Sequence, residues 1–162
     1  MKYLIVGLGN IGPEYELTRH NIGFLTIDRL ADQYDAKWES GRLAFKSEFK
    51  HKGRTIHLIK PTTYMNLSGK AVNYWMKELS IPKENILVLV DEVAIPFGKL
   101  RMRAKGSAAG HNGLKGRQAD YVLGKFKQEE FDQLPEIMDK AIDMVLGFCT
   151  IGIAQTMTQY ND

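Results

Sequence analysis

The stretch Ile86-Leu87-Val88-Leu89-Val90, which ends at Asp91, decides the fold class of this chain. Five consecutive apolar residues before an acid predict a central strand that is buried on both faces, as in a mainly parallel sheet. A second apolar run, Lys2-Tyr3-Leu4-Ile5-Val6, ends at Gly7 and predicts another buried strand. Sheets of this kind are covered by helices, so we expect an α/β protein.

The remaining elements agree with that class. Apolar residues recur at helical spacing over residues 22–34, 69–79, 129–146 and 151–160, which predicts four helices. Alternation in residues 45–50 and 54–60 predicts a hairpin that turns at His51-Lys52-Gly53, with Ile56 and Leu58 facing inward. No repeat or linker divides the 162 residues. We therefore expect a single-domain α/β sandwich with a mixed sheet.

Composition points to an ordinary globular protein of a reducing compartment. Hydrophobic residues make up 44% of the chain and charged residues 25%. The single cysteine, Cys149, excludes an intrachain disulfide and is expected to be a buried small hydrophobe rather than a nucleophile. No signal-peptide pattern is visible, and no apolar run approaches the roughly 20 residues of a membrane span. A soluble cytoplasmic protein without membrane association is expected.

One short segment carries more positive charge than the net +3 of the whole chain. Lys99, Arg101, Arg103 and Lys105 alternate with apolar residues, so in a strand all four would lie on one face. A face that carries only cations attracts phosphate backbones. The alternative is an ordinary solvated sheet face.

Two histidine–asparagine pairs end glycine-rich loops: His20-Asn21 and His111-Asn112. An imidazole can activate water, and Asp91 lies where a strand end could orient it, as in a catalytic triad. Neither histidine has a second ligand at a usual metal-binding spacing, so no metal is expected. A polar turn is the alternative for His111. For Asn66 the alternative is a helix N-cap, although Ser68 suits that position better.

The first glycine loop also matches the dinucleotide-binding pattern at Gly7, Gly9 and Gly12. That pattern requires a helix to open among the glycines, whereas Pro13 follows them here. It also requires an acid at the end of a second strand about 20 residues later, which is absent. A dinucleotide-dependent oxidoreductase is therefore disfavoured, and a tight turn remains the plain alternative.

Six collinear blocks over nearly the whole chain resemble bacterial peptidyl-tRNA hydrolase. They are Gly7-Leu8-Gly9-Asn10 with Tyr15, Thr18-Arg19-His20-Asn21-x-Gly23-Phe24, Lys60-Pro61-x-Thr63-Tyr64-Met65-Asn66-Leu67-Ser68-Gly69, Pro96-x-Gly98, Gly110-His111-Asn112-Gly113-Leu114-Lys115 and Tyr121-Val122-Leu123-Gly124-Lys125-Phe126. The resemblance implies a three-layer, phosphorylase/hydrolase-like sandwich. It also implies a monomer that hydrolyses the ester between a peptide and the 3′ end of tRNA, with no cofactor.

The resemblance also assigns residues. His20 matches the catalytic base, Asp91 the acid that orients it, and Asn10 an amide of the catalytic set. Substrate-binding positions are matched by Tyr15, Tyr64, Met65, Asn66, His111 and Asn112. The cations Lys99, Arg101, Arg103 and Lys105 fall where the family contacts tRNA phosphates.

The chain departs from the family after Lys115, where Gly116-Arg117-Gln118-Ala119 leads directly to Asp120-Tyr121. A helix, a strand and their connections, roughly 20–25 residues, are missing there. An omitted segment, a deletion and a sequence error would each produce this gap. We favour an omitted segment as the explanation, because the sequence blocks on both sides of the gap still resemble the family. The gap also leaves a catalytically inactive RNA-binding relative of the same fold as the alternative function.

Overall fold

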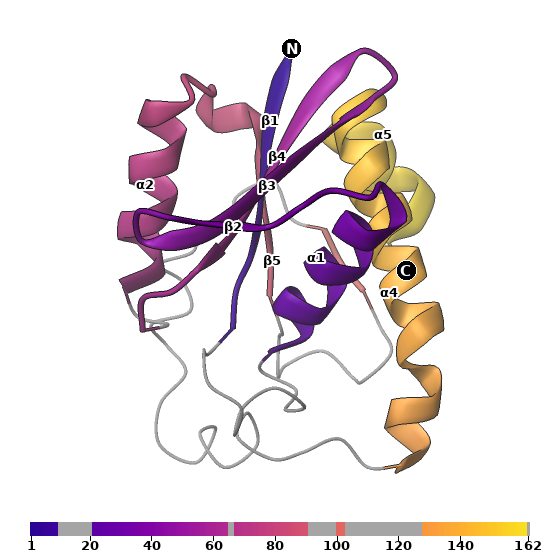
Figure 1. Cartoon of the computed structure of the whole chain (residues 1–162). Helices are drawn as coiled ribbons and strands as arrows, with labels where there is room; N and C mark the ends of the chain where they lie inside the picture. Colours follow the sequence, from indigo (N-terminus) through magenta and orange to yellow (C-terminus); the bar gives the residue numbers. More distant parts are fainter. Residues whose placement is uncertain (10–20, 65–66, 91–99, 103–127, 162) are drawn as a thin grey trace.

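The computed structural model describes residues 1–9, 21–64, 67–90, 100–102 and 128–161. These residues form a mixed five-stranded sheet with helices on both faces, so the α/β prediction is confirmed (Figure 1). The strands are β1 (Lys2–Gly7), β2 (Glu39–Gly41), β3 (Ala44–His51), β4 (Arg54–Pro61) and β5 (Ile86–Leu89). The helices are α1 (Ile22–Gln33), α2 (Ser68–Glu78), the short 3₁₀ helix η4 (Lys83–Asn85), α4 (Gln128–Thr150) and α5 (Ile153–Tyr160).

The sheet has the order β2-β3-β4-β1-β5. β1 is parallel to both of its neighbours, β4 and β5, whereas β2, β3 and β4 are joined antiparallel. The predicted hairpin is confirmed as β3 and β4. Its two turn residues, Lys52 and Gly53, have φ angles of 49° and 79°, as the tight turn between twisted strands requires.

Two hydrophobic clusters lie on opposite faces of the sheet. Tyr3 and Ile5 face the cluster beneath α1 and α4, while Leu4 and Val6 face the cluster beneath α2. In Figure 1, α2 covers one face of the sheet, and α1, α4 and α5 cover the other. The described chain therefore has three layers, and β1 lies inside the sheet between β4 and β5.

Among the described residues, the strand over 86–90 is neither central nor fully buried, which corrects the prediction for this part of the chain. β5 lies at the edge of the described sheet, pairs there with β1 alone, and is half-buried at all four positions. Its side chains nevertheless alternate between the two clusters, which explains the uninterrupted apolar run. β1 lies inside the sheet, between β4 and β5, and its residues Leu4, Ile5 and Val6 are fully buried.

The four predicted helices are confirmed, with different ends. α4 continues to Thr150, beyond the predicted end at 146, and includes Pro135. Gly152, with a φ of 88°, separates α4 from α5. α2 begins at Ser68 itself, so Leu67 occupies the N-cap position and the preference for Ser68 as N-cap is wrong.

Candidate active site

The carboxyl ends of three parallel strands define one edge of the sheet. Gly7 at the end of β1 is opposite Leu89 at the end of β5, and β4 ends close by at Pro61. Ligands of open α/β sheets bind outside such an edge. We therefore build the candidate site here.

The chain segments that leave β1 and β5 are joined at this edge. The backbone N–H of Leu8 donates to the carbonyl oxygen of Leu89 over 3.0 Å, and the Leu8 side chain is fully buried. This bond extends the pairing of the two strands by one residue. It fixes the direction in which each segment leaves the sheet.

The first turn of α1 packs against the same point. A Cβ atom on Gly23 would lie 2.5 Å from the Leu8 carbonyl oxygen and closer still to that of Leu89. A Cβ on Gly9 would lie 2.7 Å from Asn21 Oδ1 and 2.8 Å from the Phe24 ring. Only glycine permits approaches this close.

These contacts bring three distant segments together. Gly9 precedes Asn10, Asn21 follows His20, and Leu89 lies two positions before Asp91. The described neighbours of the three expected catalytic residues thus meet at one edge of the sheet. The residues themselves lie outside the described residues.

Most of the predicted site residues lie outside the described residues. Those outside the described residues are Asn10, Tyr15, His20, Met65, Asn66, Asp91, Lys99, Arg103, Lys105, His111 and Asn112. The structure places two predicted site residues, Tyr64 and Arg101, and both are exposed to solvent.

Tyr64 lies just beyond the end of β4, and its side chain is 81% exposed. Its carbonyl oxygen accepts a 2.8 Å hydrogen bond from the Leu67 N–H, which closes a turn immediately before α2. Exposed large apolar side chains are available for ligand contact. The substrate-binding role expected of Tyr64 stays a prediction.

Arg101 lies between Leu100 and the buried Met102. The side-chain amide of Asn161 accepts a hydrogen bond from the Met102 N–H over 2.9 Å and donates one to its carbonyl oxygen over 3.0 Å. The expected strand is not formed in residues 100–102, the described part of the basic segment. An amide side chain beyond the end of α5 provides these backbone hydrogen bonds instead, and Arg101 is still directed to solvent.

Lys60 is the penultimate residue of β4, one position before the strand ends at the edge that carries the candidate site. Its ammonium group is 2.6 Å from Asp28 Oδ1 on α1, and its side chain is only 16% exposed. The same group lies over the rings of Trp38, Phe45 and Phe24, at 4.4, 5.8 and 5.9 Å from the ring centroids. It therefore links β4 and α1 close to the candidate site.

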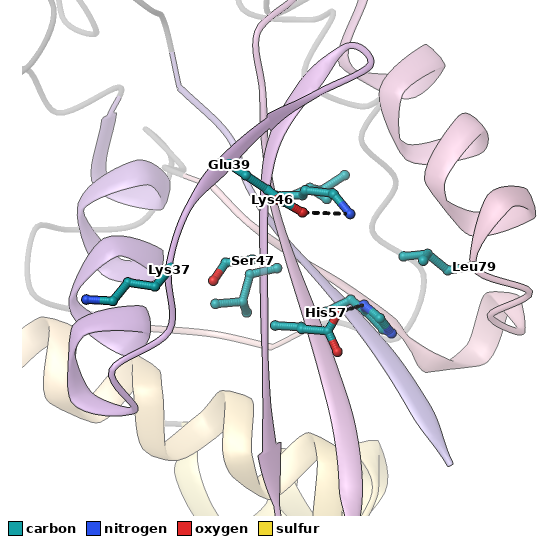
Figure 2. Close-up of a pocket in the computed structure, with 9 residues that line it drawn as sticks. Lys37, Glu39, Lys46, Ser47, His57 and Leu79 are labelled. Carbon is teal, nitrogen blue, oxygen red and sulfur yellow. Dashed lines mark ion pairs between the residues drawn. The ribbon is translucent and has the colours of Figure 1, made fainter.

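A separate pocket of about 280 Å³ lies elsewhere and includes none of the predicted site residues. Figure 2 shows Lys46 of β3 paired with Glu39 of β2, and their charged atoms are 3.0 Å apart. His57 also lines the pocket, 4.0 Å from Glu48. Burial lowers the pKa of His57; Glu48 raises it, and Lys2 and Lys46 lower it further. We assign no catalytic role to this pocket.

Cys149 is buried in α4 with 1% of its surface exposed, which confirms the predicted small hydrophobe. Burial raises the pKa of its thiol to about 12, so the thiolate that a nucleophile requires is scarce at neutral pH.

Among the described residues, no group of three or more His, Cys, Asp or Glu side chains could hold a metal ion. No helix in this part of the chain is long and apolar enough to cross a bilayer.

Sequence patterns did not reveal Lys60, Asp28 or Asn161 as structural links. Lys60 and Asp28 are 32 positions apart, and Asn161 and Met102 are 59 apart. Local periodicity carries no information on such pairs. The apolar surroundings of Lys60, by contrast, follow from the alternation of β4, which places Lys60 on the same face as the buried Ile56 and Leu58.

Comparison with known proteins identifies the family. The family model described as peptidyl-tRNA hydrolase matches residues 4–119 of the 162. The chain belongs to the peptidyl-tRNA hydrolase family. Among its relatives, peptidyl-tRNA hydrolase of Cytophaga hutchinsonii is 50% identical over 185 residues, covering 99% of this chain and 98% of the relative. That of Porphyromonas gingivalis is 46% identical, covering 99% and 100%.

A solved member of the family has the same fold. The crystal structure of peptidyl-tRNA hydrolase from Acinetobacter baumannii superposes with a TM-score of 0.89 at 32% identity. The match covers 98% of this chain and 94% of that one. The similarity therefore extends across the sheet and both helical layers, and it confirms the fold expected from the resemblance.

The comparison also bears on chain length. The family member from Parabacteroides distasonis is aligned over 186 residues, with both chains covered completely. That is 24 more positions than the 162 residues of this chain. The match to the family model ends at residue 119, close to Lys115. The placement of the gap directly after Lys115 stays a prediction.

Proposed function

We propose that this chain hydrolyses the ester bond between a peptide and the 3′ end of tRNA, and so returns tRNA to translation. Membership of the peptidyl-tRNA hydrolase family supports this function. The observation that carries the mechanism is the meeting of Gly9, Asn21 and Leu89 at one edge of the sheet. The three segments that begin there contain the residues needed for hydrolysis.

In this mechanism His20 removes a proton from water as the water attacks the ester carbonyl. Asp91 holds the imidazole in the tautomer that accepts this proton and stabilises the cation that forms. An ester has an alkoxide leaving group, so one general base contributes a useful factor, about 10²–10⁴ in rate. Asn10 contributes an amide next to the water and the developing oxyanion.

Neutral groups hold the substrate in the proposed site. Asn66 and Asn112 offer amides to the peptide backbone, which suits a substrate of arbitrary peptide sequence. Tyr15, Met65 and His111 line the path of the peptide or the terminal nucleotide. We assign the exposed Tyr64 to the entrance of this path.

Phosphate contacts position the tRNA part of the substrate without reading its bases. We assign these contacts to Lys99, Arg101, Arg103 and Lys105. Exchange of Arg101 and Arg103 together for Ala is expected to weaken tRNA binding and to flatten its salt dependence, by a slope of about 0.7–0.9 for each lost phosphate contact. Titrations of tRNA over a series of salt concentrations check this, and an unchanged slope would exclude the segment as a phosphate track.

The proposed enzyme works as a cytoplasmic monomer with peptidyl-tRNA as its partner. Neither a cofactor nor a metal ion takes part in the proposed mechanism. The base, the orienting acid and the amide donors are all supplied by side chains of this chain.

The variant His20→Ala tests the proposal. Hydrolysis of peptidyl-tRNA is expected to fall by about 10² or more, because the general base is removed. The affinity for deacylated tRNA is expected to stay within about twofold, because the phosphate contacts are untouched. Near-normal hydrolysis by this variant would exclude His20 as the base.

A further inference from the structure

Lys60 and Asp28 form a short ion pair between a strand and a helix that both lead to the candidate site. Lys60 lies one position before the end of β4, and Asp28 lies near the middle of α1. Their charged atoms are 2.6 Å apart. Beyond its end at Pro61, β4 leads to Tyr64 and Asn66, while α1 begins two positions after His20.

The Lys60 side chain of this pair is largely buried among aromatic rings. The Lys60 side chain is 16% exposed, and its ammonium group lies within 6 Å of the ring centroids of Trp38, Phe45 and Phe24. Aromatic faces attract a cation at these distances. They also shield the Lys60 ammonium group from solvent, while the Asp28 side chain is 43% exposed.

Phe24 connects the pair to the catalytic segments. It lies one helical turn before Asp28, on the same side of α1. Its ring packs on the backbone of Gly9, as does the side chain of Asn21. A shift of α1 along β4 would therefore move both Gly9 and Asn21, the neighbours of Asn10 and His20.

We propose that Lys60 is a positioning residue of the active site. Through its ion pair with Asp28, it sets the place of the first turn of α1 relative to the end of β4. This contact fixes the described residues that follow His20 in the chain relative to the strand that precedes Asn66. The inference rests on the proposed function, because it assigns Lys60 a part in the same site.

The variant Lys60→Met tests this role, because it keeps most of the apolar side chain but removes the charge. A displacement of the base by about 1 Å costs up to 10² in rate, so we expect kcat for peptidyl-tRNA to fall about tenfold or more. The KM is expected to stay within about twofold, because no substrate contact is lost. Asp28→Asn should lower kcat similarly, and the double variant should fall no further than either single one.

Arg29→Met provides the matched control. Arg29 follows Asp28 on α1 and pairs with Asp139 of α4 at 2.8 Å, away from β4. The substitution removes the same charge from an ion pair of similar length. It should leave kcat unchanged. An equal fall in kcat for Arg29→Met, or an unchanged kcat for Lys60→Met, would overturn the positioning role.

Hydrogen exchange gives a second readout that needs no substrate. The amide of Leu8 bonds to the Leu89 carbonyl oxygen at the site edge, and that of Thr55 bonds to the Met1 carbonyl oxygen at the other end of the sheet, both over 3.0 Å. Lys60→Met should speed exchange at Leu8 about tenfold and leave Thr55 unchanged. Equal changes at both amides, or none, would overturn the inference. Absence of hydrolysis by the wild-type chain would contradict the proposed function alone, since the exchange result still decides the role of Lys60.

Discussion

Glycine 23 shows how one residue without a side chain permits the candidate site to form. Its α-carbon faces the carbonyl oxygens of Leu8 and Leu89, where β1 and β5 end. Gly69 occupies the equivalent second position of α2, but a Cβ there would meet nothing within 4 Å. The two glycines therefore differ in their surroundings although both open a helix.

Substitution by alanine should have opposite effects at these two positions. Gly23→Ala is expected to lower the free energy of unfolding by about 1–3 kcal/mol, because two strand ends must move away. It should also reduce hydrolysis. Gly69→Ala is expected to raise the free energy of unfolding by about 0.4–1 kcal/mol, because the unfolded chain loses conformations. Urea unfolding of both variants checks this, and equal effects would contradict the packing described at Gly23.

His57 makes stability depend on pH. Its pKa is lowered from the ordinary 6.5 by burial above all, so the unfolded chain binds the proton more readily than the folded chain does. Stability is therefore retained above about pH 6.5 and is lost as the pH falls from there toward the lower pKa of the folded state. The pKa of His51 is also lowered, by burial and by Lys52 and Arg54, which adds to the same loss.

The variant His57→Gln should lose less stability than the wild type between about pH 7.5 and about pH 5.5. Glu48→Gln is the informative partner, because the Glu48 carboxylate raises the pKa of His57. Its removal should lower that pKa further and deepen the loss at acidic pH. Urea unfolding at both pH values measures the two effects. Identical pH dependence in all three proteins would contradict the lowered pKa.

At the scale of elements, Asn161, which follows α5, holds the described part of the basic segment, residues 100–102, in place. The Asn161 side chain forms hydrogen bonds with both the N–H and the carbonyl oxygen of Met102. These bonds hold the neighbouring Arg101 in a position that is exposed to solvent. Asn161→Ala is expected to lower the free energy of unfolding by about 1–2 kcal/mol, since two hydrogen bonds are lost. It should also weaken tRNA binding while kcat at saturation is unchanged. Thr158→Ala in α5 is the control, and equal tRNA affinities of the two variants would contradict the link.

Elements were predictable where one local pattern determined them. The alternation in β3 and β4 and the glycine in their turn identified the hairpin, because both reflect the period of the strand itself. The position of β5 in the sheet was not predictable. An apolar run indicates that both faces of a strand contact apolar groups, but it does not indicate how many strands lie beside it. Helix ends were missed for a related reason: the continuation of α4 to Thr150 depends on burial against the sheet, which includes Val145 and Phe148.

At the scale of the whole molecule, the parallel arrangement of β4, β1 and β5 creates the candidate site. It places three strand ends at one edge, and α1 returns to that edge through Gly23. Sequence motifs could name His20, Asp91 and Asn10, because the family resemblance carries them. The motifs could not supply the connections that hold the segments together, such as Lys60 with Asp28, since those pairs arise only from the folded arrangement.

The most direct measurement of the central claim is hydrolysis of peptidyl-tRNA in ¹⁸O-labelled water. We predict that the wild-type chain releases free tRNA and a peptide whose new carboxylate carries one ¹⁸O, because water attacks the ester carbonyl. The same reaction with His20→Ala should be slower by about 10² or more. Failure of the wild-type chain to release tRNA, or an undiminished rate in His20→Ala, would contradict the account.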